Sequence, residues 1–378
     1  MRAFSTIRIP EPRLELSAPG LYRVAATIEG QEVFFESSLP LSPGTESLAC
    51  AFLLPAMARG ARLEVEGPLG ATFLSNLDFV RRRARQWWPQ LSAGEVDAPV
   101  REDDAPASAD GGVFYTGGAD SSYALKKLHP TLKYAVFTEG FDIPLEDTER
   151  LTKARDWLSH TVRACGVAFA VVRTNLRRHR VFRRLSWEVT HGAALAAVAH
   201  ALAGIIGTMY LAASDVEPPW GSTPELDAAW SSDSMRIENY SGELSRLERV
   251  ASIARWEALR GRLRVCWENK SSDLNCGYCE KCVRTRLQLH ASGAPDGLGS
   301  FPRGRPLRSA IRRLDPVQTE LHGQWREIAG RLEDPRLRRE VERVLSGANP
   351  PRWRRGAQSA TRLARGAAKW AMRRAAIF

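Results

Sequence analysis

From Val113 to Tyr210 the chain alternates between short apolar runs and longer segments with helical periodicity. The apolar runs predict strands at 113–115, 134–138, 168–173 and 205–210. The longer segments predict helices at 121–128, 145–165 and 188–203. This order favours an α/β fold built on a doubly wound parallel sheet, in which the ligand lies beyond the carboxyl ends of the strands.

The chain on either side of this region has a different pattern. Three β-type runs separated by Pro and Gly turns lie at 20–24, 32–36 and 62–66, and they are followed by a predicted helix at 77–88. We therefore divide the sequence as follows: an N-terminal β-rich accessory domain, 1–94; an acidic linker, 95–112; the α/β domain, 113–295; a helical region, 296–349; and a basic tail, 350–378.

Gly192 to Ala213 is a stretch of 22 residues without a formally charged side chain. It is long enough to span a bilayer. However, its alanine-rich helical pattern changes at Gly204 into the short run Ile205–Tyr210. A buried helix followed by a buried strand therefore fits better than a membrane span, and the N-terminus has no segment of signal-peptide type. We expect a cytoplasmic protein.

The formal net charge of +11 is concentrated at one end of the chain. Between Pro350 and Phe378 there are eight Arg or Lys residues and no acidic residue. Tryptophan and other apolar residues are interspersed with these charges, so the tail could bind nucleic acid or an anionic membrane. A solvated terminal helix or a frayed end explains the pattern equally well. The sequence does not indicate an oligomeric state.

The segment Thr116–Ser122 connects the first predicted strand of the α/β domain to its helix. Gly117 and Gly118 let the backbone bring its N–H groups close to an anion, and Thr116, Ser121 and Ser122 add hydroxyls. The helix that follows directs its positive end to the same place. This combination predicts a phosphate-binding loop, although a Gly-Gly turn also serves as a plain connection.

The loop departs from the Walker A sequence because no Lys follows the second glycine, which disfavours a kinase or GTPase. It resembles the S-G-G-x-D-S loop of the PP-loop ATP pyrophosphatases, with Thr116 in place of the first Ser. Members of that superfamily cleave ATP between the α and β phosphates and adenylate a substrate. The resemblance implies that ATP and Mg²⁺ are bound here, with Asp120 and Ser121 in catalytic roles.

Four of the six cysteines form the pattern C-x9-C-x2-C-x2-C: Cys266, Cys276, Cys279 and Cys282. Four thiolates that converge in this way form a closed tetrahedral zinc site. An iron–sulfur cluster is the alternative, since sets of four cysteines also hold such clusters. The cations that follow, Lys281, Arg284 and Arg286, with Thr285 between them, either balance the thiolate charge or lie near a nucleotide.

Together, the loop and the cysteines resemble the 7-cyano-7-deazaguanine synthase (QueC-like) branch of the superfamily over about 113–289. That resemblance implies a HUP-type fold and an AMP-forming ligase. In such an enzyme ATP adenylates a carboxylate or amide oxygen of a small molecule, and ammonia or an amine then displaces AMP to give an amide, amidine or nitrile. The segment Pro218–Glu225 does not match that branch, so a different substrate is expected.

Further residues are predicted to lie at the ligand-facing edge of the sheet. Thr138, Gly140 and Phe141 would contact adenosine by the same resemblance, and His191 lies at the start of a predicted helix. The remaining candidates follow the third and fourth strands: Thr174, Asn175, Ser214, Asp215 and Glu217. Two alternatives stay open, a sulfurtransferase acting on tRNA or a small molecule, and a nucleotide-binding module without catalysis.

Overall fold

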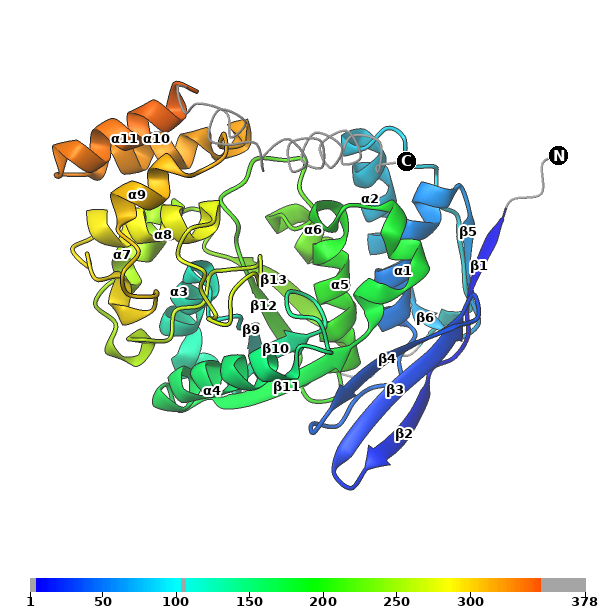
Figure 1. Cartoon of the computed structure of the whole chain (residues 1–378). Coiled ribbons are helices and arrows are strands. Elements are labelled where there is room, and N and C mark those ends of the chain that lie inside the picture. Colours follow the sequence, from blue (N-terminus) through cyan, green and yellow to red (C-terminus); the bar gives the residue numbers. More distant parts are fainter. Residues whose placement is uncertain (1–4, 103–106, 348–378) are drawn as a thin grey trace.

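In the computed structural model, residues 5–102 and 107–347 are described, and their central feature is an eight-stranded mixed sheet (Figure 1). The strand order is β13-β12-β9-β10-β11-β4-β3-β2. The first five of these are parallel to one another: β13 (Arg236–Tyr240), β12 (Thr208–Ala212), β9 (Gly111–Phe114), β10 (Tyr134–Glu139) and β11 (Ala168–Thr174). The other three are antiparallel: β4 (Gln31–Ser37), β3 (Leu21–Ile28) and β2 (Arg13–Ala18).

Neighbouring residues of a strand point to opposite faces of the sheet. On the parallel strands both faces are buried. On β10, Ala135 and Phe137 join one apolar core while Val136 joins another. The core containing Ala135 includes α3 (Ala119–Leu128) and α4 (Thr148–Ala164). The core containing Val136 includes four helices: α1 (Glu46–Arg59), α2 (Ala71–Trp87), α5 (Trp187–Ala201) and α6 (Pro224–Ala229).

These two cores confirm the predicted α/β class, and the parallel strands follow the predicted ranges closely. The fourth predicted strand begins at Thr208 rather than Ile205, because Ile205 and Ile206 lie in the turn after α5 and only their apolarity suggested a strand. The parallel strand β13 was not predicted. No helix in 5–102 or 107–347 is long and apolar enough to cross a membrane.

The N-terminal region belongs to the same sheet as the parallel strands. Asn175, directly after β11, accepts a hydrogen bond from the backbone N–H of Phe34 on β4. Helix α1 packs against α5, and their buried residues form one continuous core. The predicted accessory domain 1–94 therefore has no separate core. The predicted helix 77–88 corresponds to α2, whereas α1 was not predicted.

Smaller strand pairs complete this side of the molecule. One three-stranded sheet consists of β1 (Thr6–Ile9), β5 (Arg62–Val65) and β7 (Val96–Asp97). A two-stranded sheet pairs β6 (Leu69–Gly70) with β8 (Val100–Arg101). The predicted linker thus contributes strands on both sides of residues 103–106, which are outside the described ranges.

The C-terminal part is helical, as predicted, and packs beside α3. Helices α7 (Arg246–Ile253) and α8 (Glu280–Ala291) share an apolar core with α3 and the four cysteines. A further core joins α8 to α9 (Leu307–Arg312), α10 (His322–Arg331) and α11 (Pro335–Leu345). Helix α8 therefore connects the cysteine loop to the terminal helices.

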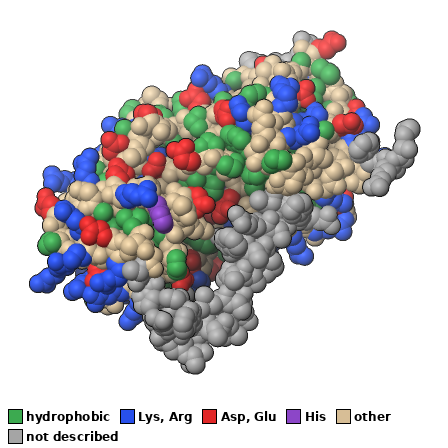
Figure 2. All heavy atoms as spheres, turned by 90° about the horizontal axis from the view of Figure 1, so that it is seen from above, with side chains coloured by type: hydrophobic (Ala, Val, Ile, Leu, Met, Phe, Trp, Pro, Cys, Tyr) green, Lys and Arg blue, Asp and Glu red, His purple; other side chains and the backbone are tan. Residues whose placement is uncertain are grey.

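The surface charge is mixed where it can be seen. On the face in Figure 2, Lys and Arg side chains are interspersed with Asp and Glu. The predicted basic tail, 350–378, lies outside the described residues. Ion pairs connect many of the arginines of the described chain to acids, for example Arg308 and Arg312 to Glu340.

Candidate functional site

The loop Thr116–Ser122 lies where β9 ends and α3 begins, at the carboxyl edge of the parallel strands. Gly118 is the N-cap residue of α3 and offers no side-chain cap, so the first N–H groups of the helix face the loop. The Ser121 hydroxyl accepts a hydrogen bond from the Thr116 backbone N–H at 3.3 Å and lies 3.3 Å from the Thr116 hydroxyl. The loop is thus shaped by the predicted hydroxyls, while the Ser122 side chain is fully buried.

Gly117 is in the left-handed conformation, with φ of 72°. Its carbonyl oxygen accepts a hydrogen bond from the Arg264 backbone N–H at 2.8 Å. A Cβ atom at this position would be 2.6 Å from Leu158 Cδ2. The first glycine of the motif is therefore required for two reasons: its left-handed backbone conformation and the close packing of Leu158 against it.

Five cations surround the loop: Arg246, Arg249, Arg264, Lys281 and Arg284. The four arginines are each no more than 6% exposed. They come from α7, from the segment that precedes Cys266 and from the second turn of α8, so elements distant in sequence place them close together. We call these five residues the cation cluster.

Several N–H groups of the cation cluster have no partner. The Nε and Nη2 atoms of Arg246 and of Arg264 are buried and make no hydrogen bond within the described part of the chain. Buried charged donors are costly unless an acceptor satisfies them. The cluster therefore fits an anion with several oxygen atoms, which would accept these hydrogen bonds.

Asp120 is the acid at the centre of this cluster. Its carboxylate is hydrogen-bonded to the Arg246 guanidinium and lies 3.4 Å from Arg249 Nε. Burial tends to raise the pKa of Asp120, but Arg246, Arg249 and Lys281 outweigh it, so the pKa lies below its ordinary value. In this arrangement Asp120 anchors two arginines beside the loop.

Burial has the opposite effect on the cations. Desolvation, reinforced by the charge of Arg246, lowers the pKa of Lys281, and burial lowers the pKa of Arg246 as well. An anion bound between these groups would restore their pKa values. The arrangement is therefore incompletely neutralised without one.

Asp142 is the second acid near the cluster, and no sequence motif indicated it. It lies just beyond β10, with its carboxylate 3.8 Å from Arg264 and acting electrostatically on Lys281. The side chain is 40% exposed. Its position between two cations and solvent suits a carboxylate that contacts a ligand or a ligand-bound cation.

Aromatic residues adjoin this acid. The ring of Trp187 lies 5.0 Å from Phe141 and 6.3 Å from His191, and His191 is 5.2 Å from Trp220. The Arg177 guanidinium stacks on Trp187 at 4.5 Å. Two predicted site residues, Phe141 and His191, are thus brought together, whereas Trp187 and Trp220 were not predicted.

The ionisation of His191 follows from its surroundings. Burial lowers its pKa to about 4, so the imidazole is neutral at pH 7. Its Nδ1 lies 3.1 Å from the Trp187 carbonyl oxygen. On β10, the predicted Thr138 is buried and its hydroxyl has no partner among the described residues.

Other predicted edge residues have structural roles. Asn175 donates to the Glu32 carbonyl oxygen at 2.8 Å as well as accepting from Phe34, so it joins β11 to β4 and does not enter the crevice. Thr174 is buried and accepts from Leu176 N–H. Asp215 accepts from the Arg246 backbone N–H at 3.2 Å, while Ser214 and Glu217 are exposed.

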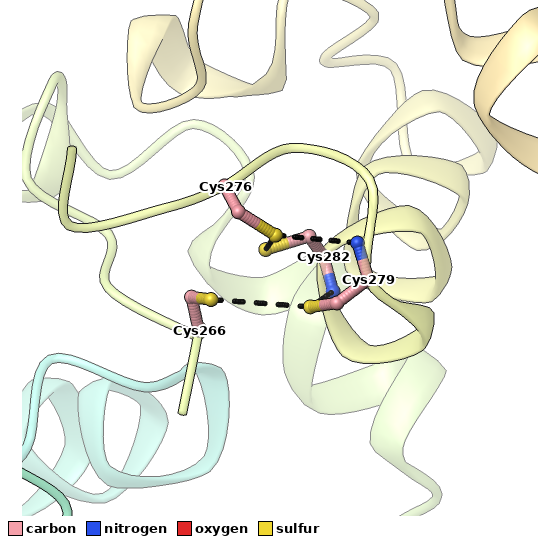
Figure 3. A group of neighbouring side chains, drawn as sticks. All are labelled: Cys266, Cys276, Cys279 and Cys282. Atoms are coloured by element: carbon pink, nitrogen blue, oxygen red, sulfur yellow. Dashed lines mark hydrogen bonds between the residues drawn. The ribbon is translucent and has the colours of Figure 1, made fainter. Parts of the chain in front are cut away.

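The four cysteines of the motif converge (Figure 3). Their sulfur atoms all lie within 4.8 Å of one another, with Cys266 Sγ 3.9 Å from Cys279 Sγ and Cys276 Sγ 3.8 Å from Cys282 Sγ. Zinc with four thiolate ligands at about 2.3 Å in tetrahedral geometry requires sulfur atoms about 3.8 Å apart. The set therefore fits a single metal ion such as zinc.

Backbone groups and one buried amide support this set. The backbone N–H of Cys279 donates to Cys276 Sγ at 3.2 Å, and that of Cys282 donates to Cys279 Sγ at 3.4 Å. The Asn275 side chain accepts from Val265 and Cys266 N–H and donates to the Leu263 and Ser300 carbonyl oxygens. Asn275 thus holds the first cysteine against the C-x2-C turn.

The cysteine set is adjacent to the cation cluster. Arg264 precedes Cys266 by two residues, while Lys281 and Arg284 flank Cys282 on α8. Arg286, in contrast, donates to the carbonyl oxygens of Gly277 and Arg305 and braces the C-x2-C turn. A metal ion here would hold three of the cations in position beside the loop.

Sequence reasoning missed Arg246, Arg249 and Arg264, because isolated arginines carry no motif. One signal for α7 was present: Ser245 and Glu248 form a capping box at its start. No family model, curated protein or solved structure matches the chain.

Proposed function

We propose that this chain is an AMP-forming PP-loop enzyme that binds ATP at the loop Thr116–Ser122. The observation that carries this proposal is the cation cluster, whose buried N–H groups lack acceptors at the start of α3. The strand order β11-β10-β9-β12-β13 supports it, since the order reverses between β9 and β12, next to the loop. By the same resemblance to the PP-loop enzymes, we propose that these parallel strands belong to a HUP-type domain.

The polyphosphate has a defined place in this proposal. Backbone N–H groups at the start of α3, with Ser121, would contact the β and γ phosphates, while Arg246, Arg264 and Lys281 would neutralise them. Bound Mg²⁺ would supply further neutralising charge, and the partly exposed carboxylate of Asp142 could contact it. Adenosine would lie toward Thr138 and Phe141, along the end of β10.

The acceptor would then lie beside the aromatic residues. A carboxylate oxygen would attack the α-phosphorus as the α–β bond breaks, so that pyrophosphate leaves within the cation cluster. Ammonia would attack the acyl carbon with its lone pair, AMP would leave, and the proton released from nitrogen would pass to solvent. The neutral His191, Trp187 and Trp220 form a wall suited to a planar, largely uncharged part of the acceptor.

Sulfur transfer is the second candidate, and the placement of the cysteines does not favour it. Cys50 is fully buried in α1, and Cys165 follows α4 at the amino end of β11, away from the loop. The other four cysteines are grouped together. No cysteine in 5–102 or 107–347 is thus both free of the cluster and adjacent to the loop to carry sulfur.

The proposal is tested by following ATP. The protein is incubated with ATP, Mg²⁺, ammonium and a panel of carboxylic acids, and ³¹P NMR records the products. AMP with pyrophosphate is the expected result, whereas release of ADP and phosphate would show that the pyrophosphatase assignment is wrong. Binding of MgATP without turnover for any acid would support the non-catalytic alternative.

Binding is measured independently of turnover. Titration calorimetry with pyrophosphate should give at least a tenfold weaker affinity for Lys281→Met, because a buried charged contact is worth about 1.5–3 kcal/mol. Lys127→Met is the matched control, since Lys127 is exposed toward the other end of α3. Equal affinities in the two variants would show that Lys281 does not contact the bound pyrophosphate.

A further inference from the structure

A row of alternating charges crosses five strands of the sheet. Glu15, Arg23, Glu36, Arg173 and Glu139 lie directly opposite one another on β2, β3, β4, β11 and β10. The consecutive nitrogen–oxygen distances are 3.4, 3.5, 2.7 and 3.5 Å. Opposite charges at directly paired positions stabilise neighbouring strands. We call this row the charge ladder.

The two ends of the charge ladder differ. At β10, Glu139 is fully buried and accepts two hydrogen bonds from Arg155, at 2.5 and 2.7 Å. At β2 the ladder stops at Glu15, whose side chain is 50% exposed. Arg13, two residues earlier on the same face, is exposed and forms no ion pair among the described residues. The open end thus presents one acid and one unused cation.

The opposite face of β2 is apolar and uncovered. Leu14 lies in a row with Val24 on β3 and Phe35 on β4, both of which are buried. Leu14 itself is 48% exposed and Leu16 is 64% exposed. The core face of the sheet therefore continues onto an edge strand whose residues are all exposed, with no helix of the described residues over it.

We infer that two copies of this chain form a dimer through their β2 strands. The two β2 strands pair antiparallel about a two-fold axis at Leu14, which places Arg13 of each copy opposite Glu15 of the other. The charge ladder then continues across the interface with the correct sign, and Leu14 contacts Leu14 on the other face. A two-fold interface requires a self-complementary patch, and these three consecutive residues provide it.

The edge of β2 is not protected in the way that isolated edges usually are. Natural edges carry a lysine, a proline or a bulge that prevents pairing. Here the bulge lies between Leu16 and Ala18, and Pro12 precedes the strand, so Arg13–Leu16 remains regular. The paired segment is short, so we expect a weak dimer whose population rises with protein concentration.

The test is sedimentation velocity of the full chain over a wide concentration range. The wild type should form a dimer, and Leu14→Lys should remain a monomer. Arg13→Glu should weaken the dimer about tenfold, because two opposite-charge pairs become two like-charge pairs. The double variant Arg13→Glu/Glu15→Arg should restore part of that loss, since the exchanged charges are again complementary across the interface. The recovery is incomplete because an arginine at position 15 faces Arg23 of the same chain.

Val100→Lys is the matched control, because Val100 is 58% exposed but lies on β8. Circular dichroism of each variant checks that the fold is retained. A wild type that stays monomeric at every concentration would overturn the inference, as would a dimer that neither Leu14→Lys nor Arg13→Glu weakens. Neither result depends on ATP chemistry.

Discussion

Gly117 and Gly118 are adjacent in the loop but leave different room for a side chain. Gly117 has φ of 72° and Leu158 in close approach, whereas Gly118 has φ of −70° and its nearest atom, the Thr116 hydroxyl oxygen, would be 3.3 Å from a Cβ. We therefore expect Gly117→Ala to weaken pyrophosphate binding strongly, with a strain of about 1–3 kcal/mol. Gly118→Ala should have a much smaller effect in the same titration. Similar losses in both variants would contradict this account of the loop.

Asp227 gives a prediction about pH. It is fully buried, and burial raises its pKa to about 7 although Asn239 and Ser222 donate to it at 2.6 and 2.7 Å. An unfolded Asp titrates near pH 3.9, so the folded state loses stability as the pH rises from about 4 to about 7. Asp227→Asn keeps an acceptor for both donors and removes the titration.

The measurement is the unfolding free energy of both proteins at pH 4.5 and pH 8. The unfolding free energy of Asp227→Asn should increase relative to that of the wild type as the pH rises, by up to about 4 kcal/mol. Asp78→Asn, at an exposed position on α2, should not show this increase. Parallel pH profiles for wild type and Asp227→Asn would show that the carboxyl is not neutral in the folded protein.

At this scale the sequence indicated the residues that form motifs but not those brought in by folding. Thr116–Ser122 and the four cysteines have diagnostic spacing, so their grouping could be predicted. Arg246 and Asp142 reach the loop only through the packing of α7 and the turn after β10. Asn175 was predicted to lie at the site but does not. A polar residue after a strand can equally form hydrogen bonds with the neighbouring strand, as Asn175 does with β4.

Among the elements, helix α1 was missed because it lacks a polar face. Twelve of its 14 residues are buried and it contains Pro55, so neither amphipathic periodicity nor propensity indicated a helix. β13 was missed because a short strand with one buried residue gives no pattern to recognise. The strands and helices between 113 and 210 were predictable because their apolar residues follow the period of the element.

A metal ion held by the four cysteines would connect the cysteine loop to α8. We expect Cys279→Ala to lose about one zinc ion per chain and to lower the melting temperature, because the three remaining cysteines would no longer be cross-linked. The affinity for pyrophosphate should fall as well, since Arg264 and Lys281 are adjacent to the ligands. Metal analysis, calorimetry and thermal unfolding measure these three effects.

Cys165→Ser is the control for that experiment, since Cys165 follows α4 and lies outside the four-cysteine group. It should retain both the metal and the affinity. Iron and inorganic sulfide in the purified protein, in place of zinc, would contradict the single-ion geometry. Retention of full pyrophosphate affinity without metal would separate the cysteine set from the cation cluster.

For the whole molecule, the continuous sheet predicts that the α/β region cannot fold without the N-terminal region. Removing residues before Gly111 would take away β2–β4 and α1, which would expose the edge of β11 and the apolar surface of α5. We expect such a variant to be insoluble or to lack a cooperative thermal transition. A variant ending at Gly347 keeps the described helices and should unfold in one transition like the full chain. A well-folded protein beginning at Gly111 would instead support an independent accessory domain at 1–94. It would show that the parallel strands fold without the apolar residues of the N-terminal region.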